Sequence, residues 1–293
     1  MQPHDAVIIG AGPAGIAAAI QLLRSGIRPL MFDDQNPGGL LWNANRVENY
    51  PGFPGGLSGP RLARRMIRQL RLTGGVVHHG RVASVEFDRR FRLRTHLGEI
   101  EARTVVLATG TKPRPLVDFD IANEARDRIF RHVWPMRRLR DREIVIVGAG
   151  DAAYDYALTL SRHNDVLIVQ RSESARCLPL LQERVAGNER IRVLVGTQLL
   201  SAQAHGACLR LTLGSTQGVD TLSADRLVLA TGREPDLSCL SPNILDQRSA
   251  LEASGRLHLV GDVRRGTCRQ ASIAVGDGVL AAMRISGEHA SAA

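Results

Sequence analysis

One pattern constrains this fold more than any other, and it occurs twice. A run of β-branched and other apolar residues leads into a glycine-rich turn, and a helical repeat of apolar residues follows. The first copy covers residues 6–23 and the second covers residues 144–160. This order is typical of the start of a βαβ unit, in which a helix joins two parallel strands. The sequence therefore predicts an α/β protein with two tandem, three-layer Rossmann-like dinucleotide-binding domains.

A second repeated segment indicates how the two domains are arranged along the chain. Residues 105–110 (VVLATG) recur almost unchanged as residues 227–232 (LVLATG), and each copy follows a stretch of alternating strand pattern. The most economical topology inserts one domain into the other. We therefore expect an FAD-binding domain made of residues 1–115 and 234–293, and an NAD(P)H-binding-like domain made of residues 116–233.

The first glycine-rich turn has the spacing of a pyrophosphate-binding loop. Gly10 makes the tight turn, Gly12 lets the backbone approach a phosphate, and Gly15 lets the helix pack on the strand. The N-terminus of that helix carries a partial positive charge that favours phosphate. Asp33 ends the next strand, about 20 residues further on, where an acid would bind an adenosine ribose. Asp34 is the less well placed alternative.

The second turn keeps Gly148 and Gly150 and has alanine in place of the third glycine, which is an accepted variant. No acid ends the strand that follows, because Gln170 stands there. Arg171 and Arg176 follow it and can pair with a 2′-phosphate, which favours NADPH over NADH. The alternative is that both are ordinary solvated side chains in an arginine-rich chain.

Composition excludes several classes of protein. The 293 residues suffice for two domains, and no run approaches the roughly 20 apolar residues of a membrane span. We expect no signal peptide and a cytoplasmic protein. The net charge of +9 attracts acidic partners or anionic ligands. Aromatic residues make up only 4% and no nucleic-acid motif is present, so we expect no nucleic-acid partner.

The cysteines are widely spaced and never form Cys-x-x-Cys, which favours free thiols over a disulfide framework or a zinc site. They are Cys177, Cys208, Cys239 and Cys268.

Further motifs link the chain to a known family. They are GAGPAG at 10–15, PGG at 37–39, VENYPG at 47–52, GDV at 261–263 and RQA at 269–271. With these motifs in this order, the whole chain resembles the low-molecular-weight thioredoxin reductases and the ferredoxin/flavodoxin–NADP reductases of the same architecture. The resemblance implies FAD as cofactor, a pyridine nucleotide as second ligand and a homodimer.

The expected ligand contacts combine the turn motifs with this resemblance, which places Asp262 near the ribityl or phosphate region and packs 269–271 against the isoalloxazine. The expected FAD contacts are Gly10, Gly12, Pro13, Ala14, Gly15, Asp33, Gly38, Gly39, Asn49, Thr109, Gly110, Asp262, Arg269, Gln270 and Ala271. The expected NAD(P) contacts are Gly148, Gly150, Asp151, Ala152, Arg171 and Arg176.

The chain departs from the thioredoxin reductases where their redox-active Cys-x-x-Cys would stand. Residues 131–136 read RHVWPM. Reduction of a disulfide by thiolate attack needs a paired thiol, so the usual route to thioredoxin is excluded. Trp134 and Met136 either cover the flavin or pack a seam between the domains. Residues 150–155 (GDAAYD) are closer to the ferredoxin/flavodoxin reductase form, whereas the family's His-Arg-Arg cofactor signature is degraded at 170–172 (QRS).

These observations predict an FAD-dependent NAD(P)H oxidoreductase that passes electrons to an external acceptor without an internal disulfide. The acceptor would be a small molecule or an acidic electron-carrier protein of the ferredoxin or flavodoxin kind. The alternative is an FAD-binding relative that has lost NAD(P)H turnover and acts as a partner or sensor, or is reduced by another donor. No catalytic residue is assigned, since the cofactors carry the chemistry.

Two features have both a functional and a structural interpretation. Cys268 directly precedes the RQA motif and is either a redox thiol activated by nearby arginines or an inert side chain. The predicted helix 60–72 carries five arginines on one face, and a basic pair stands at 264–265. Either site could dock an acidic electron carrier, or be merely solvated.

Overall fold

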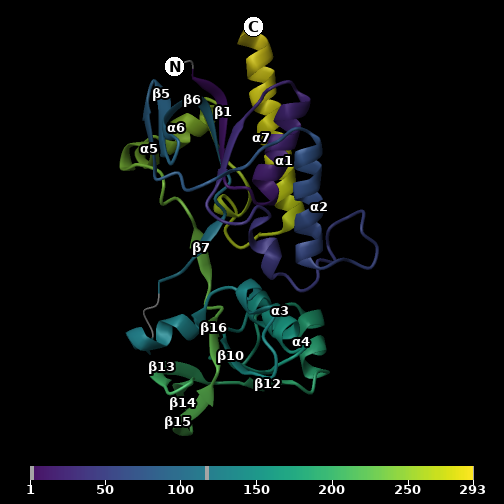
Figure 1. Ribbon diagram of the computed structural model, residues 1–293, viewed down its shortest axis with the longest axis vertical. Helices are drawn as coiled ribbons and strands as arrows, with labels where there is room; N and C mark the ends of the chain where they lie inside the picture. Colours follow the sequence, from purple (N-terminus) through teal and green to yellow (C-terminus); the bar gives the residue numbers. More distant parts are fainter. Residues whose placement is uncertain (1–2, 116–118, 293) are drawn as a thin grey trace. The chain divides into compact units, whose positions relative to one another are not determined.

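The computed structural model describes residues 3–115 and 119–292, and the chain divides into two compact units (Figure 1). Unit 1 comprises Met1–Trp42, Val47–Lys112 and Glu234–Ala293. Unit 2 comprises Asn43–Arg46 and Pro113–Arg233. Unit 2 thus includes a four-residue segment from the first quarter of the chain, which the sequence did not indicate.

Unit 1 is built on a mixed sheet with helices packed on it. Its elements are β1 His4–Ile9, α1 Pro13–Arg24, β2 Leu30–Asp33, η1 Gly39–Asn43, α2 Gly59–Leu72, β3 His78–His79, β4 Ser84–Asp88, β5 Arg90–Thr95, β6 Gly98–Leu107, α5 Pro242–Asp246, α6 Arg248–Ala253, β18 Leu257–Leu259, η4 Gly261–Val263 and α7 Ala271–Ala292. The strand order is β3-β2-β1-β6-β5-β4, and β18 also pairs with β6. Strands β3, β2, β1, β6 and β18 are parallel, whereas β4, β5 and β6 form an antiparallel meander.

Small residues let the helices of unit 1 pack closely. Helices α1, α2 and α7 lie side by side (Figure 1). A Cβ atom at Gly278 of α7 would lie 2.1 Å from the carbonyl oxygen of Ala14 in α1. This close approach fixes α7 against the start of α1, and so brings the C-terminal part of the chain to the first glycine-rich turn.

Unit 2 repeats the parallel arrangement and adds a second sheet. Its parallel sheet has the order β12-β11-β10-β16-β9, and a four-stranded sheet has the order β15-β14-β13-β8. The elements are β8 Asp120–Ile121, η2 Asn123–Arg128, β9 Ile129–Phe130, η3 Trp134–Met136, β10 Glu143–Val147, α3 Asp151–Leu160, β11 Asp165–Val169, α4 Pro179–Ala186, β12 Ile191–Leu194, β13 Gln198–His205, β14 Cys208–Ser215, β15 Gly218–Ala224 and β16 Arg226–Leu229. The connecting strands β7 Thr111–Pro113 and β17 Arg233–Pro235 pair with each other.

The predicted α/β class with two Rossmann-like units is confirmed. In each unit the glycine-rich turn joins a central strand to a helix. Each strand is apolar and largely buried after its first one or two residues, and the turn lies at its carboxyl end. Within the described residues, no helix combines the length and apolarity needed to cross a membrane. Those residues also hold no cluster of histidine, cysteine and acidic side chains that could bind a metal ion.

Candidate functional site

The first glycine-rich turn, between β1 and α1, has three different glycine environments. A Cβ at Gly10 would lie 2.3 Å from the Ala108 carbonyl oxygen, and one at Gly15 would lie 1.9 Å from the Gly10 carbonyl oxygen. Gly10 also has a φ of 104°, which side-chain-bearing residues rarely adopt. Gly12 caps α1 and has nothing within 4 Å of its Cβ position. Gly10 and Gly15 are therefore required for packing, whereas Gly12 opens onto space at a helix N-terminus.

Asp33 lies next to this turn at the end of β2. Its Oδ2 accepts a hydrogen bond from the Ala11 backbone N–H at 2.5 Å, and its Oδ1 accepts one from the Gln35 N–H at 2.7 Å. Burial raises the pKa of this carboxyl, and the two backbone N–H groups counteract part of that rise. Asp34, the alternative, is exposed. A carboxylate held against the turn is suited to bind the two hydroxyls of an adenosine ribose.

A second segment closes over the turn from residues 37–39. The Gly38 N–H donates to the Ala11 carbonyl at 2.7 Å, and a Cβ at Gly39 would lie 3.2 Å from the Gly12 Cα. Both glycines have positive φ, at 107° and 57°. Glycine is thus needed here both for its conformation and for the close approach of backbone to the pyrophosphate loop.

The C-terminal motifs reach the same edge of the unit 1 sheet. A Cβ at Gly261, one residue before Asp262, would lie 2.9 Å from the Ala14 Cβ in α1. Asn49 donates through Nδ2 to Gln270 Oε1 at 2.7 Å. Segments at 10–15, 33, 38–39, 49 and 261–270 therefore meet at the carboxyl ends of the parallel strands, as ligand sites in such sheets do.

The remaining residues expected at this site lie on the segments that lead into it. Thr109 donates through Oγ1 to the Asp236 carbonyl at 2.7 Å, and Gly110 has a φ of 67°. Arg269 donates through Nε to the Arg265 carbonyl at 3.3 Å, and Ala271 is the first residue of α7.

FAD fits the residues of this site. An open helix N-terminus at Gly12 suits the pyrophosphate, the Asp33 carboxylate suits the adenosine ribose, and the Asn49–Gln270 pair places amide groups where the resemblance puts the isoalloxazine.

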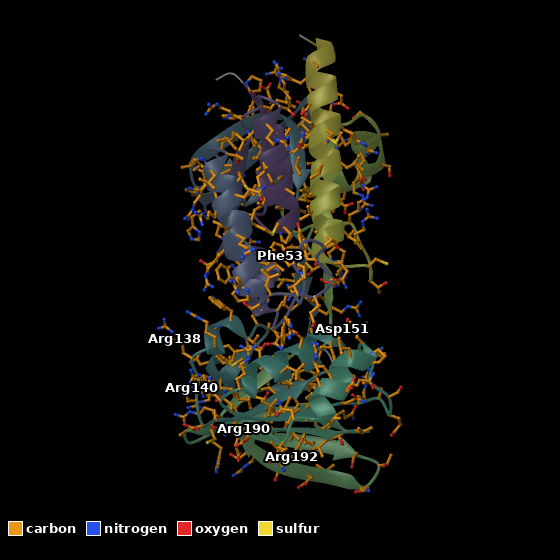
Figure 2. The ribbon with its side chains drawn as sticks, turned by 90° about the vertical axis from the view of Figure 1, so that its right-hand side faces the viewer. Phe53, Arg138, Arg140, Asp151, Arg190 and Arg192 are labelled. Atoms are coloured by element: carbon orange, nitrogen blue, oxygen red, sulfur yellow. The ribbon has the colours of Figure 1, made fainter. Side chains whose placement is uncertain are left out.

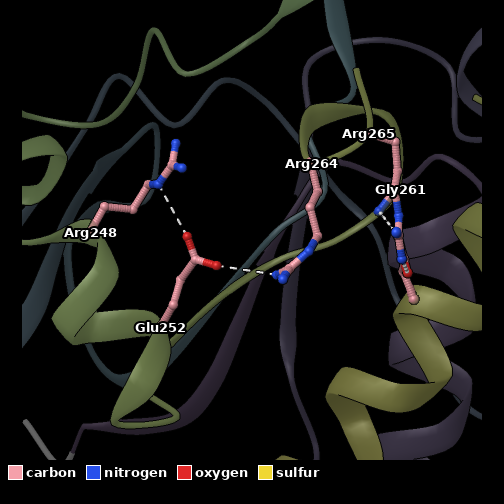
Figure 3. Close-up of polar contacts among 6 residues, drawn as sticks. Arg248, Glu252, Gly261, Arg264 and Arg265 are labelled. Carbon is pink, nitrogen blue, oxygen red and sulfur yellow. Dashed lines mark hydrogen bonds and ion pairs between the residues drawn. The ribbon is translucent and has the colours of Figure 1, made fainter. Parts of the chain in front are cut away.

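Asp277, which the sequence analysis did not single out, supports the Gly261 segment. Its carboxylate accepts from the Gly261 N–H at 3.1 Å and from the Arg265 Nε at 3.0 Å, and a second bond joins Arg265 Nη2 to Oδ1 (Figure 3). Asp277 is only 9% exposed. A single acid within the small and apolar first half of α7 was the signal that could have identified it.

The second glycine-rich turn, between β10 and α3, differs from the first in what covers it. A Cβ at Gly148 would lie 2.6 Å from the Ala230 carbonyl oxygen, so this glycine is again required for packing. Gly150 caps α3 and forms a β-bridge with Arg176, whose N–H donates to the Ala149 carbonyl at 2.7 Å. Asp151 Oδ1 accepts from the Leu178 N–H at 2.8 Å. The segment 176–178 is thus hydrogen-bonded to the turn, and the Asp151 side chain makes one of these bonds. Ala152 follows Asp151 in the first turn of α3.

No carboxylate stands at the ribose position of unit 2. Gln170 is 2% exposed there; its Oε1 accepts from the Tyr154 hydroxyl at 2.9 Å and its Nε2 donates to the Ser172 carbonyl at 2.8 Å. Arg171 and Arg176 follow on the surface. An adenosine ribose would therefore meet guanidinium groups here, whereas in unit 1 it would meet a carboxylate.

The region where a redox cysteine pair would stand contains basic and apolar groups. Arg131 Nη1 and His132 Nδ1 are buried without a hydrogen-bond partner among the described residues. Burial, together with Arg233 and Arg131, lowers the pKa of His132 to about 4, so its imidazole is neutral at pH 7. Met136 is 2% exposed and belongs to the core of unit 2, which accounts for it without either role suggested by the sequence. Arg137 stacks on the Trp134 ring, 4.1 Å from its centroid.

The segment Asn43–Arg46 is held by this same part of unit 2. Asn43 Oδ1 accepts from the N–H groups of Val133 and Trp134, each at 3.0 Å. Asp155 Oδ2 accepts from the Asn45 N–H at 2.8 Å, and burial raises the pKa of this carboxyl to about 6. Asp155 had been noted only as part of a motif, and its contact with a segment 110 residues away is a tertiary feature.

The cysteines are all free thiols, as predicted. Cys239 is buried and Cys177 half-buried, and burial raises the pKa of each thiol to about 11, which disfavours the reactive thiolate. Cys268 is exposed. Of the three arginines expected to activate it, Arg264 pairs with Glu252 at 3.1 Å, Arg265 pairs with Asp277 and Arg269 donates to the Arg265 carbonyl (Figure 3).

Comparison with known proteins agrees with this architecture. A family model described as pyridine nucleotide-disulphide oxidoreductase matches residues 4–279. The thioredoxin reductase of Rickettsia conorii is 30% identical over 298 residues, which cover 94% of this chain and 95% of that protein. The thioredoxin reductase of Streptomyces clavuligerus is 32% identical over 296 residues, covering 96% and 92%. The crystal structure of Lactococcus lactis thioredoxin reductase in its FR conformation matches with a TM-score of 0.85 at 26% identity, over 97% of this chain and 99% of that one.

The fold and its first glycine-rich turn define the class as a flavin-dependent oxidoreductase built from two Rossmann-like units. More particularly, the chain belongs to the pyridine nucleotide-disulphide oxidoreductase family. The predicted resemblance to the thioredoxin reductases is thereby confirmed, and FAD is the cofactor that the family and the unit 1 site both indicate.

Proposed function

We propose that this protein is an FAD-dependent NADPH oxidoreductase that delivers electrons to an external acceptor without an internal redox disulfide. One observation carries the proposal: the site in unit 1 suits FAD, while residues 131–136 contain no thiol. The relatives are named thioredoxin reductases, which favours a small protein acceptor. A disulfide acceptor would, however, need a thiol pair that this chain lacks in that position.

Each unit has a distinct task in this proposal. In unit 1, the N-terminus of α1 stabilises the pyrophosphate, Asp33 orients the adenosine ribose, and the Asn49–Gln270 pair positions the ring system. In unit 2, the turn at Gly148–Gly150 binds the NADPH pyrophosphate while Arg171 and Arg176 pair with its 2′-phosphate. FAD held by these unit 1 residues would supply the redox chemistry between the nicotinamide and the acceptor.

The assignment of domains and assembly belongs to the same proposal. Residues 1–115 and 234–293 would form the FAD-binding domain and residues 116–233 the NADPH-binding domain. The protein would act as a cytoplasmic homodimer, by analogy with its relatives.

One observation favours a second candidate, a flavoprotein that has lost NADPH turnover. The segment 176–178 is hydrogen-bonded to the unit 2 turn, and Gln170 and Ser172 replace two members of the family's nucleotide signature. Such a protein would keep FAD and take electrons from another donor, or none.

Anaerobic stopped-flow spectroscopy separates the two candidates. NADPH and NADH are each mixed with the FAD-loaded protein and the flavin absorbance is followed. We expect bleaching by both nucleotides and faster bleaching by NADPH. If neither NADPH nor NADH bleaches the flavin, the NADPH oxidoreductase is rejected and the second candidate remains. Rapid NADPH-driven reduction of thioredoxin would contradict the exclusion of a disulfide acceptor.

A further inference from the structure

Helix α2 presents a continuous basic surface in unit 1. Five arginines lie on it at spacings of three and four residues, and all five are exposed: Arg61, Arg64, Arg65, Arg68 and Arg71. None of them forms an ion pair with a carboxylate within residues 3–115 and 119–292. We call these five residues the α2 arginine face.

The opposite face of the same helix is fully used in packing. Leu62, Ala63, Met66 and Leu70 are all buried in unit 1. An amphipathic helix that binds a lipid surface inserts its apolar face between the headgroups. Because this apolar face is already buried, only the charged side remains for a partner, which favours a protein surface over a bilayer.

Aromatic rings hold two of the guanidinium groups in place. The Arg64 guanidinium lies 5.3 Å from the Trp42 ring centroid, and that of Arg65 lies 5.0 Å from the Phe53 centroid. Such stacking leaves the N–H groups of arginine available for carboxylates while reducing the side-chain entropy lost on binding. Leu72 follows the basic face at 78% exposure and supplies an apolar contact beside it.

Helix α2 contacts the proposed flavin site through the buried face that lies opposite its arginines. A Cβ at Gly38 would lie 2.8 Å from the Cβ of Ala63 in α2, and Gly39 next to it approaches Gly12. On the other side, Phe53 beneath Arg65 contacts the Tyr50 ring, and Asn49 next to Tyr50 bonds to Gln270. A protein docked on α2 would therefore sit one layer of residues from the segments that hold the cofactor.

Two other basic surfaces lack these properties. Arg265 is paired with Asp277, and Arg264 shares the Glu252 carboxylate with Arg248, so both guanidinium groups already have a carboxylate partner (Figure 3). In unit 2, Arg138, Arg140 and Arg190 precede β10 and β12 (Figure 2). They lie at the amino ends of the strands, the edge opposite the nucleotide turn.

We propose that the α2 arginine face is the docking surface for the electron acceptor, a small redox protein whose surface is acidic around its redox group. This inference rests on the proposed function, since it names the partner class. Five positive charges without a carboxylate partner in the described part of the chain, on a helix packed against the segments proposed to hold the flavin, would steer such a partner and orient its redox group. A second copy of this chain would bring like charges together on that face and is disfavoured.

The test measures binding directly, without NADPH, so that it is independent of turnover. Oxidised flavodoxin, an acidic carrier, is titrated into the FAD-loaded full-length protein by calorimetry at low and at physiological ionic strength. We expect binding that weakens as salt rises. The variant Arg61→Glu/Arg68→Glu, which spares both stacked arginines, should weaken binding about tenfold or more at low salt. Arg61→Lys/Arg68→Lys should retain most of it.

The matched control is Arg138→Glu/Arg190→Glu, which changes the net charge equally at exposed positions on the far edge of unit 2. Flavin content and melting temperature establish that each variant is folded. If flavodoxin binding weakens equally in both glutamate variants, it depends on overall charge and not on the α2 arginine face. No binding of flavodoxin at low salt, or binding only to phosphatidylserine vesicles, would overturn the proposal. A change in oligomeric state in the α2 variant would show a self-interface instead. Failure of NADPH to bleach the flavin would affect only the proposed function.

Discussion

The two glycine-rich turns begin alike and become different sites. Both have a tight first glycine packed against a neighbouring strand, and both end in a glycine that caps a helix. In unit 1 the cap opens onto space and Asp33 stands beside it. In unit 2 the segment at Arg176 is bonded to the turn, and the position of the acid is taken by Gln170, which is buried in a bond to Tyr154.

This difference shows which part of a dinucleotide fold is general and which part is specific. The turn and helix N-terminus bind any pyrophosphate, because they act through backbone N–H groups and the helix dipole. The residue that ends the second strand discriminates between nucleotides, because it meets the ribose. Under the proposed function, the same supersecondary structure would hold FAD in one unit and NADPH in the other.

The largest expected difference between the two turns comes from placing the same bulky side chain in each of them. Gly12 and Gly150 both have extended backbone angles, with φ of −72° and −101°, so a leucine is not strained at either position. We expect Gly12→Leu to abolish FAD retention, because its side chain would occupy the space of the pyrophosphate. Gly150→Leu should keep FAD and lose NADPH-dependent bleaching. Flavin content after gel filtration checks FAD retention in both variants, and anaerobic stopped-flow spectroscopy checks bleaching in Gly150→Leu. Normal FAD content in Gly12→Leu would show that the pyrophosphate lies elsewhere.

The half-buried carboxyl of Asp155 in unit 2 gives a second test, through pH. The pKa of Asp155 rises from 3.8 to about 6 on folding, so its stabilising effect is present at low pH and is lost as pH rises through 6. Relative to wild type, Asp155→Asn should be more stable at pH 7 than at pH 4.5 by about 2 kcal/mol. Urea unfolding at both pH values tests this, and His132 cancels because both proteins contain it. If the stability difference between Asp155→Asn and wild type is the same at both pH values, the folded-state carboxyl of Asp155 is already ionised at pH 4.5.

Asp33 tests the ribose contact in unit 1. We expect Asp33→Asn to raise the FAD dissociation constant about tenfold, because a charge-assisted hydrogen bond becomes a neutral one. NADPH affinity should not change. Fluorescence titration of the apoprotein with FAD measures the effect. An equal loss with Asp34→Asn would indicate a general charge effect and not a specific contact.

Arg171 and Arg176 provide the corresponding test of the nucleotide contact in unit 2. We expect Arg171→Ala/Arg176→Ala to weaken NADPH up to about tenfold while leaving NADH nearly unchanged, since only NADPH carries the 2′-phosphate. The concentration dependence of flavin bleaching gives both affinities. Equal weakening of the two nucleotides would mean that these arginines do not contact that phosphate.

Much of the fold could be predicted because its signals are local. The two strand–turn–helix segments need only apolar runs and glycines at fixed spacing, and α2 could be predicted from its apolar and basic periodicity. The inclusion of Asn43–Arg46 in unit 2 had no such signal. It depends on the Asn43 side chain meeting two N–H groups some 90 residues later.

The site divides in the same way. Gly10, Gly12, Gly15 and Asp33 follow from their spacing, since backbone sterics and strand length place them together. Tertiary structure alone decided that Gln170 is buried against Tyr154 and that Asp277 supports Gly261. It also decided that Arg264 has a carboxylate partner while the α2 arginine face has none among the described residues. Sequence determines which charges and turns exist, because composition and local geometry suffice for that. Which of those charges stay uncompensated depends on which segments pack together, and only the folded chain settles it.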